Sequence, residues 1–149
     1  GGIRVVDDFA HQPAEVEATL RAARQEAGGG RVVCLFQPHR YTRTQILHRA
    51  FGPALALADM VGVMDVYPAA EKPIPGVSGQ LVAQAVREQG RAAPFLRSHR
   101  EALEWLESTA RSGDLVLVMG AGDVWKVGKE FLKHRRGGGS VGTGPGPAA

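Results

Sequence analysis

The sequence of 149 residues has one cysteine, few aromatic residues and no apolar run long enough to span a bilayer. A single cysteine, Cys34, excludes an internal disulfide and fits a reducing compartment. The chain starts Gly1-Gly2 without methionine or a signal peptide. We therefore expect a cytoplasmic piece of a longer chain, with no membrane partner.

Several motifs of catalysis are also missing. No GxxxxGK[ST] loop is present to cradle a nucleoside triphosphate, and no serine occupies a nucleophile elbow. The absence of HxxH and CxxC spacings gives no support for a metal site, so we expect none. Gly120-Ala-Gly122 resembles the start of a dinucleotide fingerprint, but Gly128 follows at the wrong spacing. A tight turn is the better interpretation of these glycines.

The charge is mildly basic, at a net +3 with positive and negative residues interspersed. Arg40, Arg43, Arg49 and the basic run at 133–136 are the candidates for nucleic-acid contacts. No aromatic residues are interleaved with them to form a stacking platform. We therefore expect no nucleic-acid partner.

Apolar runs rich in β-branched residues alternate with helical patterns along the chain. The expected strands are 3–6, 31–36, 60–66, 92–96 and 115–119. The expected helices are 13–27, 45–57, 78–90, 98–110 and 124–131, with Thr44 as the cap of the second. Short connections between alternating elements predict an α/β fold, with a Rossmann-like, open, mostly parallel sheet covered by helices on both faces. Residues 1–136 form one domain, and the composition of 137–149 predicts a disordered Gly/Pro-rich tail.

The segment Phe36-Gln-Pro-His-Arg-Tyr-Thr-Arg-Thr44 joins the second strand to the second helix. His39, Arg40 and Arg43 lie on this strand-to-helix loop, where open α/β sheets bind ligands. Each guanidinium fits a carboxylate or phosphate bidentately, so we expect an anion site. A helical turn would place Arg40 and Arg43 on one face. The alternative is a solvated turn with ordinary surface arginines.

Four loops follow the carboxyl ends of strands, at 7–13, 37–44, 66–77 and 120–123. In a parallel sheet they meet at one edge, which we call the rim. The polar side chains expected there are Asp7, Asp8, His11, His39, Arg40, Arg43, Glu71 and Asp123. Asp8 has an alternative role as an Asx-turn or cap, and His11 and His39 as structural imidazoles.

Four motifs together resemble the C-terminal domain of the Mur ligase family, in the branch that adds L-alanine to UDP-N-acetylmuramate. They are DDFAHQPAE at 7–15, FQPHRYTRT at 36–44, DVYPAAEKPIPG at 65–76 and GAGD at 120–123. The resemblance covers residues 3 to 132 in order. Departures are Gln12 for a usual second histidine, Phe9 and Ala10 for Tyr and Gly, and Ala70 for a frequent Gly.

The resemblance implies ATP-dependent amide synthesis for peptidoglycan, through an acyl phosphate. In that family a central P-loop domain carries ATP and Mg²⁺ and an N-terminal domain binds the UDP-sugar, which implies that this chain is inactive alone. Carried onto this chain, the resemblance implies a catalytic role for His11, substrate binding by His39, Arg40 and Arg43, and nucleotide contacts by Asp7 and Asp8. The alternative is a stand-alone Rossmann-like module that binds an anionic metabolite.

Overall fold

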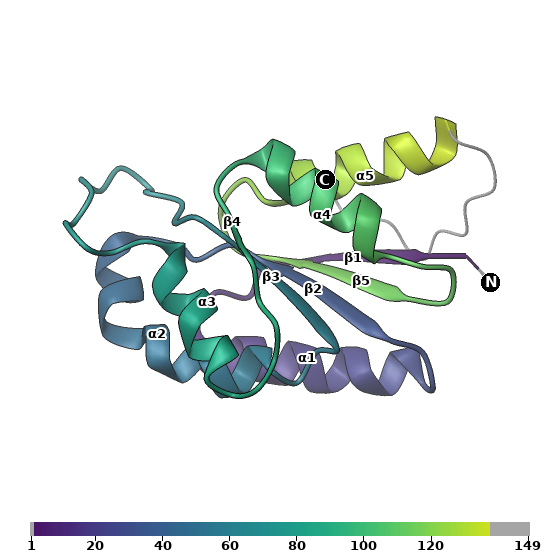
Figure 1. The fold of residues 1–149 in the computed structure, drawn as a ribbon, viewed down its shortest axis with the longest axis horizontal. Helices are drawn as coiled ribbons and strands as arrows, with labels where there is room; N and C mark the ends of the chain where they lie inside the picture. The colour runs from purple at the N-terminus through teal and green to yellow at the C-terminus, as the bar shows by residue number, and fades with distance from the viewer. Residues whose placement is uncertain (1, 138–149) are drawn as a thin grey trace.

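The computed structural model describes residues 2–137 and contains five parallel strands and five helices (Figure 1). The strands are β1 (Arg4–Asp8), β2 (Val32–Phe36), β3 (Met60–Met64), β4 (Phe95–Leu96) and β5 (Leu115–Met119). The helices are α1 (Pro13–Ala27), α2 (Tyr41–Leu55), α3 (Gly79–Arg87), α4 (His99–Thr109) and α5 (Trp125–Gly137). Of the expected tail, Gly137 lies in α5 and the remainder lies outside the described residues.

The strands form one sheet in the order β1-β5-β2-β3-β4, and every pairing within it is parallel. Helices α1, α2 and α3 cover one face, and α4 and α5 cover the other (Figure 1). The predicted Rossmann-like layout is therefore confirmed. β2 lies at the centre with β5 beside it, and all residues of both strands are buried, as expected for parallel strands covered on both faces.

The side chains of each central strand alternate between two apolar cores. Cys34 and Phe36 face the core under α1–α3, whereas Val33 and Leu35 face the core under α4 and α5. Cys34 is fully buried, and burial raises the pKa of its thiol. It is an inert packing residue, as the sequence indicated.

Of the five predicted strands, 115–119 has the expected bounds, β3 ends two residues early at Met64, and the largest differences are in β1 and β4. β1 continues through Asp7 and Asp8, which pair with Val118 and Met119 of β5, so the loop begins two residues later than expected. β4 shrinks to Phe95–Leu96 at the sheet edge. Each of these strands extends only as far as its neighbour pairs with it. The local sequence pattern does not contain that information.

The predicted cap of α2 is wrong. The helix begins at Tyr41, and Arg40 occupies the N-cap with φ 73°. Thr44 lies inside the helix, where its hydroxyl donates to the Arg40 carbonyl at 2.8 Å. Serine side chains cap the next two helices: Ser78 accepts from the Gln80 amide, and Ser98 accepts from the Glu101 amide.

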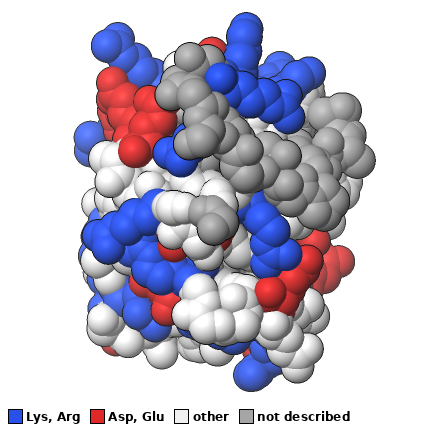
Figure 2. All heavy atoms as spheres, turned by 90° about the vertical axis from the view of Figure 1, so that its right-hand side faces the viewer, with Lys and Arg blue, Asp and Glu red and all other residues white. Residues whose placement is uncertain are grey.

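Within residues 2–137, no helix combines the length and the apolar character needed to cross a membrane. The end of the molecule near the N-terminus of β1 shows basic and acidic side chains interspersed (Figure 2). This distribution agrees with the low net charge of the sequence.

Candidate functional site at the carboxyl ends of the strands

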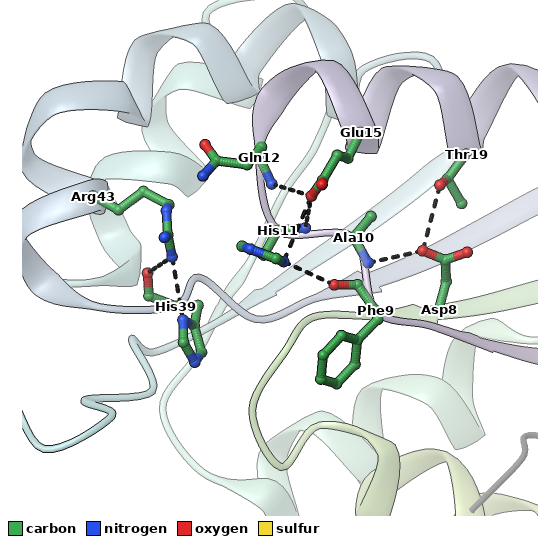
Figure 3. Close-up of polar contacts among 9 residues, drawn as sticks. All are labelled: Asp8, Phe9, Ala10, His11, Gln12, Glu15, Thr19, His39 and Arg43. Carbon is green, nitrogen blue, oxygen red and sulfur yellow. Dashed lines mark hydrogen bonds and ion pairs between the residues drawn. The ribbon is translucent and has the colours of Figure 1, made fainter.

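His39 lies at the centre of the rim. Its Nδ1 is 3.2 Å from Nη1 of Arg43, which also donates to the His39 carbonyl at 3.0 Å (Figure 3). A guanidinium only donates, so His39 Nδ1 accepts and the proton of the neutral ring is on Nε2. Burial, followed by the charges of Arg43, His11 and Arg40, lowers the pKa of His39. The imidazole is therefore held neutral, with Nε2–H as its donor.

His11 comes to the same place from the loop after β1. The ring centroids of His11 and His39 are 5.8 Å apart. His11 Nδ1 donates to the Phe9 carbonyl at 3.0 Å, and the His11 amide donates to Glu15 (Figure 3). Nε2 of His11 makes no hydrogen bond within the described chain, so it is free to contact a ligand. The predicted meeting of His11, His39 and Arg43 is confirmed.

Glu15 holds this loop at the start of α1. Its Oε1 accepts from the His11 and Gln12 amides at 3.1 Å each, and Pro13 occupies the first turn. Those two amide bonds lower the pKa of Glu15. Gln12 serves as the N-cap of α1. Glu15 holds the loop through backbone amides and not through the His11 side chain, so the imidazole of His11 stays accessible.

Arg40 and Arg43 have different surroundings. Arg43 is engaged by His39, whereas Arg40 is exposed, and its side chain makes no hydrogen bond to the residues that the structure describes. The positive φ of Arg40 takes it out of the helix, so the spacing argument for one shared helical face does not hold. Arg40 is therefore the guanidinium that remains available to an incoming anion.

The carboxylate of Glu71, from the loop after β3, lies at the N-terminus of α2. It accepts from the Thr42 amide at 3.1 Å and from the Thr42 hydroxyl, and these bonds lower its pKa. An anion at a helix N-terminus is stabilised by the free amides and the helix dipole. Glu71 fills the position that the Arg40 N-cap leaves without a side-chain cap. Ala69 and Ala70 precede it at φ 50° and 70°, in the left-handed region that favours glycine.

Asp7 and Asp8 lie on opposite faces of the sheet because they are successive strand residues. Asp8 points to α1, where its Oδ1 accepts from the Ala10 amide at 2.8 Å and from the Thr19 hydroxyl at 3.4 Å (Figure 3). This is the capping alternative that the sequence left open. Burial, followed by the charge of Asp8, raises the pKa of Asp7. The expectation that both carboxylates project from one loop is wrong, since strand pairing extends through them.

Asp123 belongs to a second polar group on the rim. Its Oδ1 accepts from Gln37 Nε2 at 2.8 Å and pairs with His99 Nε2 at 3.1 Å. Burial opposes ionisation of Asp123, but these two contacts outweigh it and lower its pKa. Gln37 is buried and its Oε1 accepts from the Val124 amide. The sequence does not indicate that Gln37 or His99 belongs to the site, because nothing in either residue's local pattern shows that it contacts Asp123.

Tyr67 is the other residue that the sequence did not reveal. Its ring stacks on His39, with centroids 5.6 Å apart and an interplanar angle of 11°. The backbones of the two residues form an isolated parallel bridge. An aromatic residue directly before Pro68 was the available signal.

Among the residues described, no three His, Cys, Asp or Glu side chains come together to hold a metal ion. The rim instead presents an exposed guanidinium, two adjacent imidazoles and several internally bonded carboxylates. Such a set binds an anion and donates hydrogen bonds to it.

Comparisons with known proteins identify the family to which the chain is similar. Residues 1–122 match the family described as "Mur ligase, glutamate ligase domain". The chain is 56% identical over 131 residues to UDP-N-acetylmuramate–L-alanine ligase of Kineococcus radiotolerans, covering 88% of this chain and 28% of the relative. It is 48% identical to the ligase of the same name from Pelotomaculum thermopropionicum, covering 89% of this chain and 29% of the relative.

The fold also matches a crystal structure of UDP-N-acetylmuramate-alanine ligase from Thermotoga maritima. The TM-score is 0.72 at 28% identity, over 92% of this chain and 27% of that one. The chain thus spans less than a third of the length of these relatives. With a family match over most of its residues and relatives above 40% identity, the chain belongs to the Mur ligase family.

Proposed function

We propose that this chain is the C-terminal, amino-acid-binding domain of an ATP-dependent ligase that joins L-alanine to UDP-N-acetylmuramate in peptidoglycan synthesis. The single observation that carries the proposal is the cluster of Arg40, His39, Arg43 and His11 at the carboxyl ends of parallel strands. The names of the curated relatives supply the choice of amino acid and sugar nucleotide.

Recognition of alanine depends on its carboxylate, because a methyl group gives little discrimination. The free guanidinium of Arg40 receives the carboxylate, and Nε2–H of His39 donates a second hydrogen bond. Arg43 acts on the other side of the imidazole, where it keeps Nδ1 as an acceptor. A fixed carboxylate places the alanine amine near the carbonyl that it attacks.

The nucleotide side of the proposal concerns β1 and the loop after it. His11 presents Nε2, and Asp8 has one carboxylate oxygen outside the bonds to Ala10 and Thr19. A carboxylate accepts from a hydroxyl and repels phosphate, so either Asp7 or Asp8, each from its own face of the sheet, suits the ribose of ATP. ATP with Mg²⁺ supplies the phosphoryl group that activates the muramoyl carboxylate, and other domains of the longer enzyme hold both. This chain alone is therefore inactive.

A chimera tests the proposal. In the Kineococcus radiotolerans relative, the segment that matches this chain is replaced by residues 1–137, and ADP release is measured. We expect ADP release that requires both L-alanine and UDP-N-acetylmuramate, and none from the fragment alone. The relative truncated at the junction is the matched control. A folded chimera that releases no ADP, or releases it regardless of alanine, would contradict the proposal.

The stand-alone alternative has a separate measurement. Under it, the isolated chain binds an anionic metabolite without help from other domains. Calorimetric titration of the chain with L-alanine, ATP and UDP-N-acetylmuramate distinguishes the two, since the ligase assignment predicts only weak binding of alanine to the isolated domain. The comparisons do not favour this alternative.

A further inference from the structure

Three loops of the rim meet at Tyr67. Its backbone amide donates to the Pro38 carbonyl at 2.8 Å, and the Arg40 amide donates to the Tyr67 carbonyl at 2.8 Å. These reciprocal bonds tie the loop after β3 to the loop after β2. Pro68 disfavours helical backbone at Tyr67, which suits this strand-like pairing.

The side chain of Tyr67 is confined on two sides. One side is the imidazole of His39, nearly parallel at an interplanar angle of 11°. The other is the backbone of Gly122 in the loop after β5. A Cβ added at Gly122 would lie 2.4 Å from Tyr67 Cγ, so only glycine lets the two approach this closely.

The confined ring of Tyr67 restricts the orientation of the His39 imidazole. The Arg43 hydrogen bond at Nδ1 fixes one point of the imidazole, but a ring held at one atom still swings about that contact. A stacked aromatic ring opposes that motion, because tilting loses the face-to-face contact. His11 flanks the imidazole at 5.8 Å but at an angle of 56°, so it does not set the plane.

We propose that Tyr67 is a positioning residue for amino-acid binding: its ring, seated against Gly122, sets the plane of His39 and thereby the direction of Nε2–H. The proposal rests on the function proposed above. Tyr67 need not touch the substrate, so its effect passes through His39. The hydroxyl of Tyr67 takes no part, and the flat ring carries the role.

The test is a double-mutant cycle in the chimera, with L-alanine KM, ATP KM and kcat as readouts. We expect Tyr67→Leu, which replaces the flat ring by a smaller apolar side chain, to raise the alanine KM about tenfold and leave the ATP KM within about twofold. Tyr67→Phe, the matched control, keeps the alanine KM within about twofold. In a His39→Gln background, Tyr67→Leu should add little further, since the two residues act through one contact.

Three outcomes would overturn the inference: a normal alanine KM in Tyr67→Leu, an equal loss in Tyr67→Phe, or a full additional loss in the His39→Gln background. If His39→Gln itself leaves the alanine KM unchanged, His39 does not bind the substrate, and the assignment of His39 under the proposed function fails with the inference. Melting curves accompany each variant. If Tyr67→Leu does not fold, Tyr67→Met enters the same cycle and is judged by the same outcomes.

Discussion

Nη1 of Arg43 lies 3.2 Å from Nδ1 of His39, four residues earlier in the chain, and this contact determines which nitrogen of His39 carries the proton. The result differs from a simple two-arginine clamp. In the proposed function, Arg43 orients the imidazole of His39, and Arg40 is left for the ligand.

Arg40→Lys in the chimera should raise the alanine KM at least about tenfold, a loss near 1.4 kcal/mol. Lysine keeps the charge but lacks the fork that binds a carboxylate at two points. The ATP KM should change little. Steady-state kinetics with each substrate varied in turn measures both, and Arg49→Lys is the matched control at an exposed position further along α2. An unchanged alanine KM would move Arg40 to the phosphate side.

His11→Ala should reduce kcat of the chimera by at least about tenfold without unfolding the domain. The loop is held by Glu15 through backbone amides, which the substitution preserves. Turnover and the melting temperature are measured together. Normal turnover with normal ATP dependence would refute the assignment of His11 to the nucleotide side.

His39→Gln should flatten the acid dependence of stability of the isolated chain. The pKa of His39 in the folded chain is below its ordinary value of 6.5, so the unfolded chain binds this proton more readily. The stability contributed by His39 is complete above pH 6.5 and is lost as the pH falls through the lower folded value. Melting temperatures between pH 8 and 5 should fall less steeply for His39→Gln than for the unsubstituted chain. Parallel curves would contradict the neutral imidazole.

His134 should contribute a pH dependence of stability opposite to that of His39. Its Nδ1 lies 2.6 Å from Glu107 of α4 and its Nε2 lies 3.1 Å from Glu130 of α5, and the bond to Glu107 is the main cause of its raised pKa. The stability that it contributes is complete below pH 6.5 and is lost as the pH rises through the raised folded value. His134→Gln should therefore lower the melting temperature at pH 6 more than at pH 9. An equal decrease at both values would show that the ion pairs contribute nothing.

Ala70→Gly should stabilise the chain by about 0.5 kcal/mol. Alanine in the left-handed region costs about 1–2 kcal/mol, and the greater entropy of an unfolded glycine offsets about 0.4–1 kcal/mol of the relief. Gly76→Ala in the same loop is the matched control with the reverse sign, because φ is 81° there and the added Cβ meets no atom within 4 Å. Urea unfolding at a constant m-value measures both. A destabilised Ala70→Gly would mean that the methyl group of Ala70 packs usefully.

The fold class was predictable because each strand and helix has a strong local pattern, as in the run 115–119 or the Ser98 cap. The order of strands was not, since β1 pairs with β5 across most of the chain. At the rim, His11, His39 and Arg43 met as expected because their loops follow parallel strands. The capping role of Glu71 was hidden, because it depends on the positive φ of Arg40 and on a turn through Ala69 and Ala70.

The position of β1 has a consequence for the order of folding. Within the described chain β1 forms its ladder only with β5, so β1 gains its partner only after the residues between them, which are most of the described chain, have been synthesised. Pairings of such high sequence separation are slow, because the entropy of closing the intervening loop is lost before the contacts form. β2 and β3, in contrast, can pair early across α2. We therefore expect the imidazole of His11, which follows β1, to join the rim in the last stage of folding.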